Sequence, residues 1–260
     1  MSTPEMKGHV GEEQSGTRRN LPGGDLKAAL ATFNTFGKNT IEEMAEAAQA
    51  RGYKYMAITD HSKNLAFANG LDDKRAVEHI ARIRAVGKQI EGITIFAGIE
   101  VDILADGDLD LSDDVLAQMD IVIASVHSVF NQEPAKMTER LLKAIENPNT
   151  SLIGHPTGRI QLRRDAYGFD MHAILTAAAK HKVAMELNSY PDRLDLNDVH
   201  LRQAKQAGVK IVINTDSHHT SHMEKIRYGI LQARRAWLTK DDVLNTLPAQ
   251  KFAKAMKHAW

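Results

Sequence analysis

Five short apolar runs, each ending in a residue that can bind a metal ion, constrain this chain more than any other feature. A buried parallel strand reads as a short continuous apolar run. In a barrel of alternating strands and helices, the C-terminal strand ends meet on one face and carry the chemistry. Imidazole and carboxylate groups at converging strand ends suit zinc, manganese or iron, which predicts a hydrolytic metal site. The runs end at Asp60-His61, Glu100, His127, His155, and Asp216 with His218.

The composition is that of one globular domain. Hydrophobic residues make up 43% and charged residues 25% of the 260 residues, which is ordinary for such a domain. The 33 basic and 33 acidic residues cancel, so no net charge draws the chain to nucleic acid. The absence of cysteine excludes disulfides and thiolate ligands. The N-terminus has neither a signal peptide's apolar core nor a membrane-length apolar run, so we expect a cytoplasmic protein outside the membrane.

The chain divides into a tail and a domain. Residues 1–23 are polar, rich in Gly and Pro and without periodicity, so they are predicted to be a linker-like tail. Residues 24–260 are predicted to form the hydrolase domain, because strand and helix patterns alternate as they do in successive βα units. Helices are expected at about 40–51, 72–90, 134–146, 170–181 and 198–207.

A series of motifs resembles a known family. AITDHSK, GIEVDIL, DGDLDL, ASVHS, GHPTGR, VINTDSH and RYGILQARR follow one another in this order. From Lys38 to about Met256 the chain therefore resembles the polymerase-and-histidinol-phosphatase (PHP) domain, in the version attached to bacterial family X DNA polymerases. PEMKG followed by GEEQ in the tail resembles the connector that follows the polymerase domain. We therefore expect a PHP module that is detached from its polymerase.

The resemblance implies a distorted (β/α)7 barrel with up to three zinc or manganese ions at the strand ends. It implies that Glu100 bridges two metals, that His127 and His155 complete one of those sites, and that Asp216 serves the other. These residues belong to the same set that the strand ends predict.

The opening of the domain departs from the family pattern. Family members begin with a strand that reads roughly GDLHxH, whereas no histidine lies between Gly24 and Lys38 here. Two ligands of the first site and one of the third are thereby missing. His61 and His218 would remain at the third site, so we expect one or two bound metal ions rather than three.

The segment that replaces this motif, DLKAALATF, can be interpreted in two ways. Its apolar residues fall on one helical face with Asp25 as a possible cap, so the first strand is either rebuilt as a helix or kept as a strand under tertiary pressure. Lys27, if it points inward, would supply a catalytic positive charge where the family holds a metal. Otherwise Lys27 is an exposed lysine of the tail.

Substrate contacts are expected from loops after the strands. Lys63 and Arg159 could hold a phosphate group, Arg as a bidentate fork and Lys as a point charge. Asn188 would orient a ligand or substrate by hydrogen bonding. The histidines on predicted helices, which are expected at the surface, are His79, His172, His181 and His200.

These observations predict a metal-dependent phosphoesterase with Glu100 and Asp216 as catalytic residues. Its substrate would be a phosphate-ester small molecule or a nucleic-acid 3′ end. One alternative is a hydrolase with an altered substrate range, such as activated phosphate esters or triesters. The other is a non-catalytic PHP-like scaffold or binding module. The Glu100, His127 and His155 set favours an enzyme, whereas the missing histidines favour the alternatives.

Overall fold

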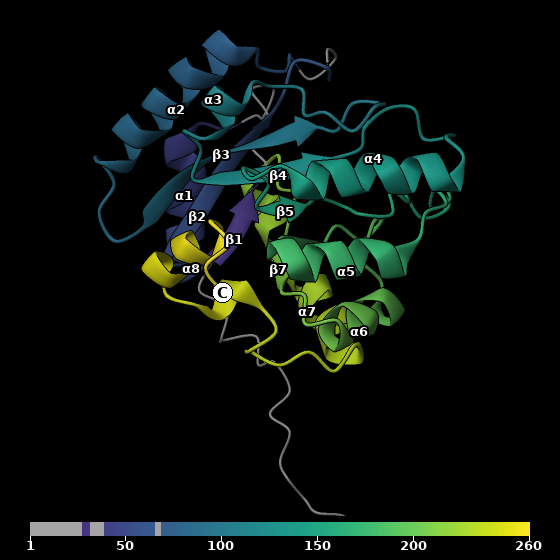
Figure 1. Ribbon diagram of the computed structural model, residues 1–260. Coiled ribbons are helices and arrows are strands. Elements are labelled where there is room, and N and C mark those ends of the chain that lie inside the picture. Colours follow the sequence, from purple (N-terminus) through teal and green to yellow (C-terminus); the bar gives the residue numbers. More distant parts are fainter. Residues whose placement is uncertain (1–27, 32–38, 66–68) are drawn as a thin grey trace, which may run out of the picture.

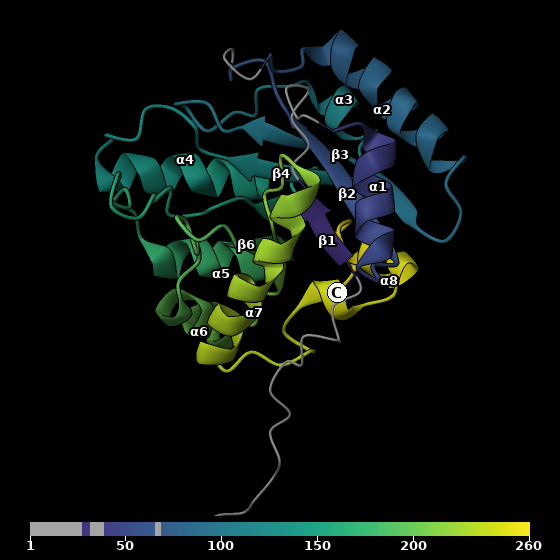
Figure 2. The same ribbon diagram turned by 180° about the vertical axis from the view of Figure 1, so that it is seen from behind.

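The computed structural model of the protein describes residues 28–31, 39–65 and 69–260. Within these residues, seven parallel strands form a closed barrel in the order β1 to β7, and helices surround it (Figures 1 and 2). The barrel is uneven, because β5 is only two residues long and a single residue pair, Leu30 with Asn214, joins β1 to β7. The expected distorted (β/α)7 barrel is confirmed.

The elements alternate along the chain. The strands are β1 (Ala28–Ala31), β2 (Tyr55–His61), β3 (Thr94–Asp102), β4 (Ile121–Ser125), β5 (Leu152–Ile153), β6 (Ala184–Asn188) and β7 (Ile211–Asn214). The helices are α1 (Ile41–Ala50), α2 (Asp73–Gly87), α3 (Asp113–Leu116), α4 (Pro134–Glu146), α5 (Met171–His181), α6 (Asp198–Gln206), η3 (Thr220–Lys225), α7 (Ile226–Arg235), η4 (Leu244–Thr246) and α8 (Ala249–Ala255). In the part of the chain that the structure describes, none of these helices has the length and apolarity needed to cross a bilayer.

The helices start where the sequence provides caps. The Thr40 hydroxyl accepts a hydrogen bond from the Glu43 backbone N–H at 3.2 Å, and the Glu43 carboxylate accepts one from the Thr40 N–H at 3.0 Å. This capping box satisfies two backbone donors that would otherwise lack partners at the start of α1. At the starts of α2, α5 and α6, the side chains of Asp72, Asp170 and Asn197 each accept one hydrogen bond from a backbone N–H of the first turn.

The segment that replaces the missing histidines contains a strand. Ala28–Ala31 runs parallel to β2, with Ala28 opposite Tyr55 and Ala31 opposite Ile58. The helix alternative is therefore wrong for these four residues. The physical reason is that β2 and β7 would otherwise have edges with unpaired backbone groups, and closure of the barrel removes those edges. Lys27, the linker-like tail of residues 1–23 and the loop of residues 32–38 lie outside the described residues.

An aromatic cluster lies at the end of the barrel where the strands begin. The Phe252 ring of α8 lies 4.8 Å from the Tyr55 ring and 5.9 Å from the Phe96 ring, measured between centroids. All three side chains are buried. Figure 1 shows α8 and the C-terminus at this end, below the start of β1. Because the strands are parallel, their polar C-terminal ends meet on the opposite face.

Arg140 of α4 is buried, at 1% exposure, and holds several loops together. Its guanidinium donates hydrogen bonds to the carbonyls of Ser128 at 3.1 Å and Val129 at 3.3 Å, and to the Gln132 side-chain oxygen at 3.3 Å. It also donates to the carbonyl of Ile103, just after β3. These bonds compensate for the burial of the charge and fix α4 against the loops that leave β3 and β4.

Candidate metal centre

Glu100, near the end of β3, lies at the centre of a group of histidines. Its Oε1 atom is 3.0 Å from His155 Nε2 and 3.3 Å from His127 Nε2, and its Oε2 atom is 3.7 Å from His61 Nδ1. Among the described residues, His61, Glu100 and His127 place their ligand atoms all within 4.8 Å of one another. Two imidazoles and a carboxylate form a donor set that zinc and manganese accept.

Two histidines of this group have a buried ring nitrogen without a hydrogen-bond partner. These atoms are His61 Nδ1 and His155 Nδ1. A buried polar atom that makes no hydrogen bond destabilises the fold by about 1–3 kcal/mol. A divalent metal bound by His61 would offset this cost at its Nδ1 atom. The residues present therefore fit the metal that the resemblance implies.

The histidine rings form a continuous row beside Glu100. The ring centroids are 6.3 Å apart for His218 and His61, 5.1 Å for His61 and His127, and 5.1 Å for His127 and His155. The resemblance assigned His61 and His218 to a separate metal. The structure brings His61 close to both Glu100 and His127, so the ligands predicted for separate metals lie in one cluster, and their division among metal ions stays a prediction.

Asp216 lies at the edge of this cluster, just after β7. Its Oδ2 atom accepts a hydrogen bond from Asn188 Nδ2 at 3.2 Å and lies 3.6 Å from Arg193 Nε. Its Oδ1 atom is 3.7 Å from His218 Nδ1. Asn188 thus contacts a predicted metal ligand, and its expected orienting role stays a prediction.

Two of the predicted ligands have an unusual backbone. The φ angle is 26° at His155 and 48° at Asp216. Residues other than glycine seldom adopt positive φ, and such strain concentrates at functional sites, where the surrounding structure maintains it. The strained positions therefore support a functional role for the ends of β5 and β7.

The environment lowers the pKa of Glu100 and raises the pKa of His127. Burial opposes ionisation of Glu100, but the neighbouring imidazoles, His61 first, hold its pKa well below the usual range. Burial also opposes protonation of His127, yet hydrogen bonds to Asp102 and Glu100 raise its pKa to about 9. A metal ion that binds His127 must therefore displace a proton.

On the other side of the cluster the shifts have opposite signs. Burial, helped by the positive charge of Arg193, lowers the pKa of His155 to about 4, so its imidazole is neutral and ready to bind a metal. Burial and the negative charges of Asp216 and Glu100 raise the pKa of Glu186 to about 8. Glu186 lies under the cluster, where its carboxyl group accepts a hydrogen bond from the His155 backbone N–H.

Sequence reasoning missed Asp102, which orients His127. The Asp102 carboxylate pairs with His127 Nδ1 and accepts a hydrogen bond from Asn64 Nδ2 at 2.5 Å. A carboxylate on one ring nitrogen directs the other nitrogen towards the metal position, here towards Glu100. Alternate residues of a strand share one face, so the spacing of two from Glu100 could have identified Asp102.

The same spacing rule identifies two more residues that the sequence reasoning missed. Glu186 precedes Asn188 by two positions on β6, and Asn214 precedes Asp216 by two positions at the end of β7. Asn214 Nδ2 donates a hydrogen bond to Glu186 Oε1 at 2.6 Å. These residues form a polar layer beneath the predicted ligands.

The phosphate contact expected at Arg159 stays a prediction, and the structure places another guanidinium, that of Arg193, beside the cluster. Arg159 Nε donates a hydrogen bond to the Arg193 carbonyl at 2.9 Å, and its Nη2 atom donates one to the Leu194 carbonyl. These contacts hold the loop that follows β6. Arg193, which sequence reasoning missed, faces Asp216, and its Nη1 atom is buried without a hydrogen-bond partner. Lys63 is exposed after β2. The guanidinium that enters the cluster belongs to Arg193.

His79 was expected at the surface, and that expectation is wrong. Its side chain is 9% exposed, and its Nε2 atom lies 2.6 Å from Asp60 Oδ2. Because neighbouring residues of a strand face opposite sides, Asp60 contacts α2 while His61 faces the cluster. His172 is exposed as expected, whereas His181 and His200 are partly buried.

Comparisons with known sequences fit this site. The model of the PHP domain matches residues 32–190. DNA polymerase/3'-5' exonuclease PolX of Bacillus subtilis (strain 168) is 45% identical over 224 residues, which cover 85% of this chain and 39% of that protein. This chain thus spans less than half the length of that relative. A probable phosphatase of Thermoanaerobacter sp. (strain X514) is 30% identical over 218 residues, covering 80% of this chain and 84% of that protein.

Among solved structures, the barrel is similar to a histidinol phosphate phosphatase from Lactococcus lactis subsp. lactis Il1403, complexed with zinc, L-histidinol and phosphate. The TM-score is 0.55 at 19% sequence identity, and the match covers 80% of this chain and 94% of that one. At this identity the likeness concerns the fold alone.

Proposed function

Because the chain belongs to the PHP domain family, we propose that this phosphoesterase is metal-dependent and cleaves phosphate mono- or diesters at the Glu100 cluster. The observation that carries the proposal is the position of Glu100, with three imidazole nitrogens 3.0 to 3.7 Å from its carboxylate oxygens. The metal ligands would be Glu100, His61, His127 and His155. When bound, zinc or manganese supplies Lewis-acid chemistry, which polarises a phosphoryl oxygen and lowers the pKa of water.

Residues around the ligands fix their orientation. Asp102 holds the His127 ring so that Nε2 faces Glu100, and the Ser125 hydroxyl donates a hydrogen bond to Glu100 Oε1 at 2.8 Å. Such contacts keep the ligands in place before a substrate arrives, which lowers the reorganisation needed during the reaction.

Arg193 and Asp216 would act on the substrate side. Arg193 Nη1 is a buried donor without a partner, so it suits a phosphoryl oxygen, and the planar guanidinium matches phosphate geometry. Burial and Glu100 oppose ionisation of Asp216, but His218 and Arg193 outweigh them and hold its pKa below the usual value. Asp216 therefore remains ionised and can orient the attacking water or contribute to a second metal. Lys63 would attract the phosphate from the loop after β2.

The missing His-x-His motif leads to a reduced metal content. We expect one or two metal ions per chain, because the cluster retains the ligands around Glu100 but lacks the histidines expected from the first strand. Elemental analysis after growth with zinc and manganese tests this number. Three full equivalents, or none, would contradict the proposed ligand set.

Hydrolysis of aryl esters tests the proposed activity. The protein should hydrolyse p-nitrophenyl phosphate or bis(p-nitrophenyl) phosphate, because a good leaving group lowers the barrier that a reduced metal site must overcome. Release of nucleotides from DNA 3′ ends should be weak, since an alkoxide leaving group needs its own stabilisation. A chelator should abolish the aryl-ester activity, and manganese or zinc should restore it.

A pair of histidine variants provides the matched control. His127→Ala should remove the activity, whereas His172→Ala, on the exposed surface of α5, should leave it unchanged. Activity that survives both chelation and His127→Ala would show that this cluster is not the catalyst. A protein that binds metal fully but hydrolyses none of these esters would favour the scaffold alternative.

A further inference from the structure

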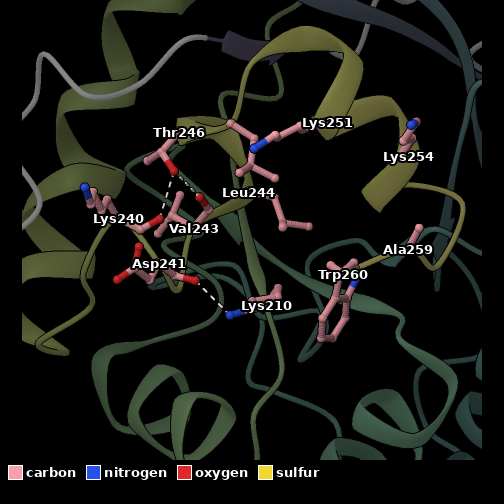
Figure 3. A pocket seen from close by; sticks show the side chains of 11 residues that line it. Lys210, Lys240, Asp241, Val243, Leu244, Thr246, Lys251, Lys254, Ala259 and Trp260 are labelled. Carbon is pink, nitrogen blue, oxygen red and sulfur yellow. Dashed lines mark hydrogen bonds between the residues drawn. The ribbon is translucent and has the colours of Figure 1, made fainter.

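A cavity of about 550 Å³ lies at the end of the barrel opposite the metal cluster (Figure 3). Lys210, which lines it, immediately precedes β7, whereas Asp216 follows the other end of the same strand. The length of the strand therefore separates the cavity from the Glu100 cluster. A cavity of this volume can hold a small organic molecule.

The walls combine an apolar surface with positive charge. Val243 and Leu244 are buried, and Leu247 and Trp260 complete the apolar part of the lining. Figure 3 shows the lysines spread around the cavity rather than gathered on one side. The charged side chains that line it are Lys210, Lys240, Lys251, Lys254 and Asp241.

This arrangement of charge favours an anion. Four lysine side chains and one aspartate side chain line the cavity, so its walls carry an excess of positive charge. Lys210 donates one hydrogen bond to the Asp241 carbonyl at 2.8 Å, which fixes its position and leaves further N–H donors. The positive charge alone would suit any anion. The apolar lining limits the expected ligand to an anion that also carries an apolar group.

Trp260 supplies the second observation. Its Nε1 atom is buried and has no hydrogen-bond partner among the described residues. The preceding segment is fixed, since the ring nitrogens of His258 lie 3.2 Å from the Lys182 carbonyl and 3.0 Å from the Pro148 carbonyl. A held indole offers a stacking surface on the wall of the cavity.

We propose that this cavity binds a small aromatic phosphate of the nucleoside monophosphate class. The aromatic base would lie against Leu244, Leu247 and Trp260, and the phosphate would face Lys251 and Lys254. Inorganic phosphate would leave the apolar wall in contact with water. The inference concerns a second binding site and does not depend on the activity proposed for the metal cluster.

The two tryptophans of the chain make a direct test possible. Trp237 is 62% exposed, so Trp237→Phe removes it with little structural effect and leaves Trp260 as the reporter. Titration of this variant with adenosine monophosphate should change the Trp260 fluorescence in a saturable way. Adding Lys251→Gln and Lys254→Gln should weaken binding about tenfold or more, because two charged donors are lost.

Control experiments test whether binding depends on surface charge in general, on nucleic acid or on the metal cluster. Lys74→Gln with Lys88→Gln, two exposed lysines of α2 and its C-cap, should leave binding unchanged. Adenosine or inorganic phosphate alone should bind more weakly than the nucleotide. Equal binding of inorganic phosphate, or affinity that grows with the length of an oligonucleotide, would overturn the proposal.

His127→Ala in chelator should still bind the nucleotide through Trp260. Loss of binding in that variant would place the nucleotide at the metal cluster and overturn the proposal. Because this readout is fluorescence of metal-free protein, a failure here is distinguishable from a failure of the phosphoesterase assay.

Discussion

The two ends of the barrel carry opposite kinds of residue on the same strands. Where β2 and β3 begin, Tyr55 and Phe96 pack against Phe252, and the Tyr55 hydroxyl donates a hydrogen bond to the Leu247 carbonyl at 2.9 Å. Where these strands end, His61 and Glu100 are buried, and the His61 Nδ1 atom has no hydrogen-bond partner. The aromatic end stabilises the fold, and the polar end holds groups whose burial is unfavourable without a ligand. Stability and chemistry are therefore separable by mutation.

The largest effect is expected at the polar end. Glu100→Gln should lower turnover of an aryl phosphate by about a thousandfold or more, because the carboxylate at the centre of the cluster loses its charge. Steady-state kinetics with added manganese measure this loss. Glu139→Gln, on the exposed face of α4, is the matched control and should keep wild-type turnover. A Glu100→Gln protein with more than a tenth of the wild-type rate would contradict the central role of this residue.

At the aromatic end the effect should fall on stability instead. Phe252→Ala should lower the free energy of unfolding by about 3–5 kcal/mol, because it removes a fully buried ring between two others. Urea denaturation measures the loss, and the milder Phe252→Leu should lose about 1.5 kcal/mol or less. Turnover per folded molecule should stay within about twofold of wild type. A large loss of turnover in folded Phe252→Ala would show that the two ends are coupled.

A pH series on metal-free protein should show the instability of the polar end. The folded pKa of His127, about 9, is raised above its ordinary value of 6.5, so its contribution to stability is complete below pH 6.5 and is lost as pH rises through 9. Glu186, raised from 4.5 to about 8, acts in the same direction between those values.

Through His127 alone, the free energy of unfolding of chelated protein should fall by about 3 kcal/mol between pH 6.5 and pH 9, and Glu186 should add to this fall. Urea denaturation at the two pH values measures the fall. Bound zinc or manganese should reduce it, since the metal replaces the proton on His127. A metal-free protein whose free energy of unfolding rises between these pH values would contradict the predicted direction of the change.

The smallest effect is expected from His79, which contacts the cluster only through Asp60. His79→Ala should weaken metal binding about tenfold, because Asp60 loses a contact that positions β2 beside His61. Competition with a metal-binding dye measures the affinity. Val77→Ala, exposed on the same helix, should change nothing, and His79→Gln should restore part of the affinity. Equal affinities for His79→Ala and wild type would show that Asp60 is held by its other contacts.

Regular patterns in the sequence predicted most of the fold. Pro134 at the first position and the apolar pattern predicted the bounds of α4, and capping residues predicted the approximate starts of α1, α2, α5 and α6, because those signals act over a few neighbouring residues. The family match confirms the expected phosphoesterase, while its substrate and metal content stay predictions. The first strand could not be decided from DLKAALATF, since the pairing that makes it a strand comes from β2 and β7.

The candidate site was predicted less completely than the fold. Ligands at strand ends were visible because strand direction alone brings Glu100 and His127 together. Arg193 and His79 were not visible, since a loop path and the packing of α2 on β2 decide where their side chains lie. In both cases the contact joins two separate elements or loops, and the periodicity within one element cannot reveal such a contact.

The buried Arg140 has a consequence for anyone who redesigns this barrel. Loops at the C-terminal strand ends are the parts that barrel enzymes exchange to change their substrates. Here the loop after β4 is bonded through its Ser128 and Val129 carbonyls to a side chain of α4, and the same side chain reaches the end of β3. A graft of that loop alone would leave a charged group in the interior without its acceptors. The exchangeable unit is therefore the loop together with its helix, so new specificities on this side should be transplanted in pieces that contain both.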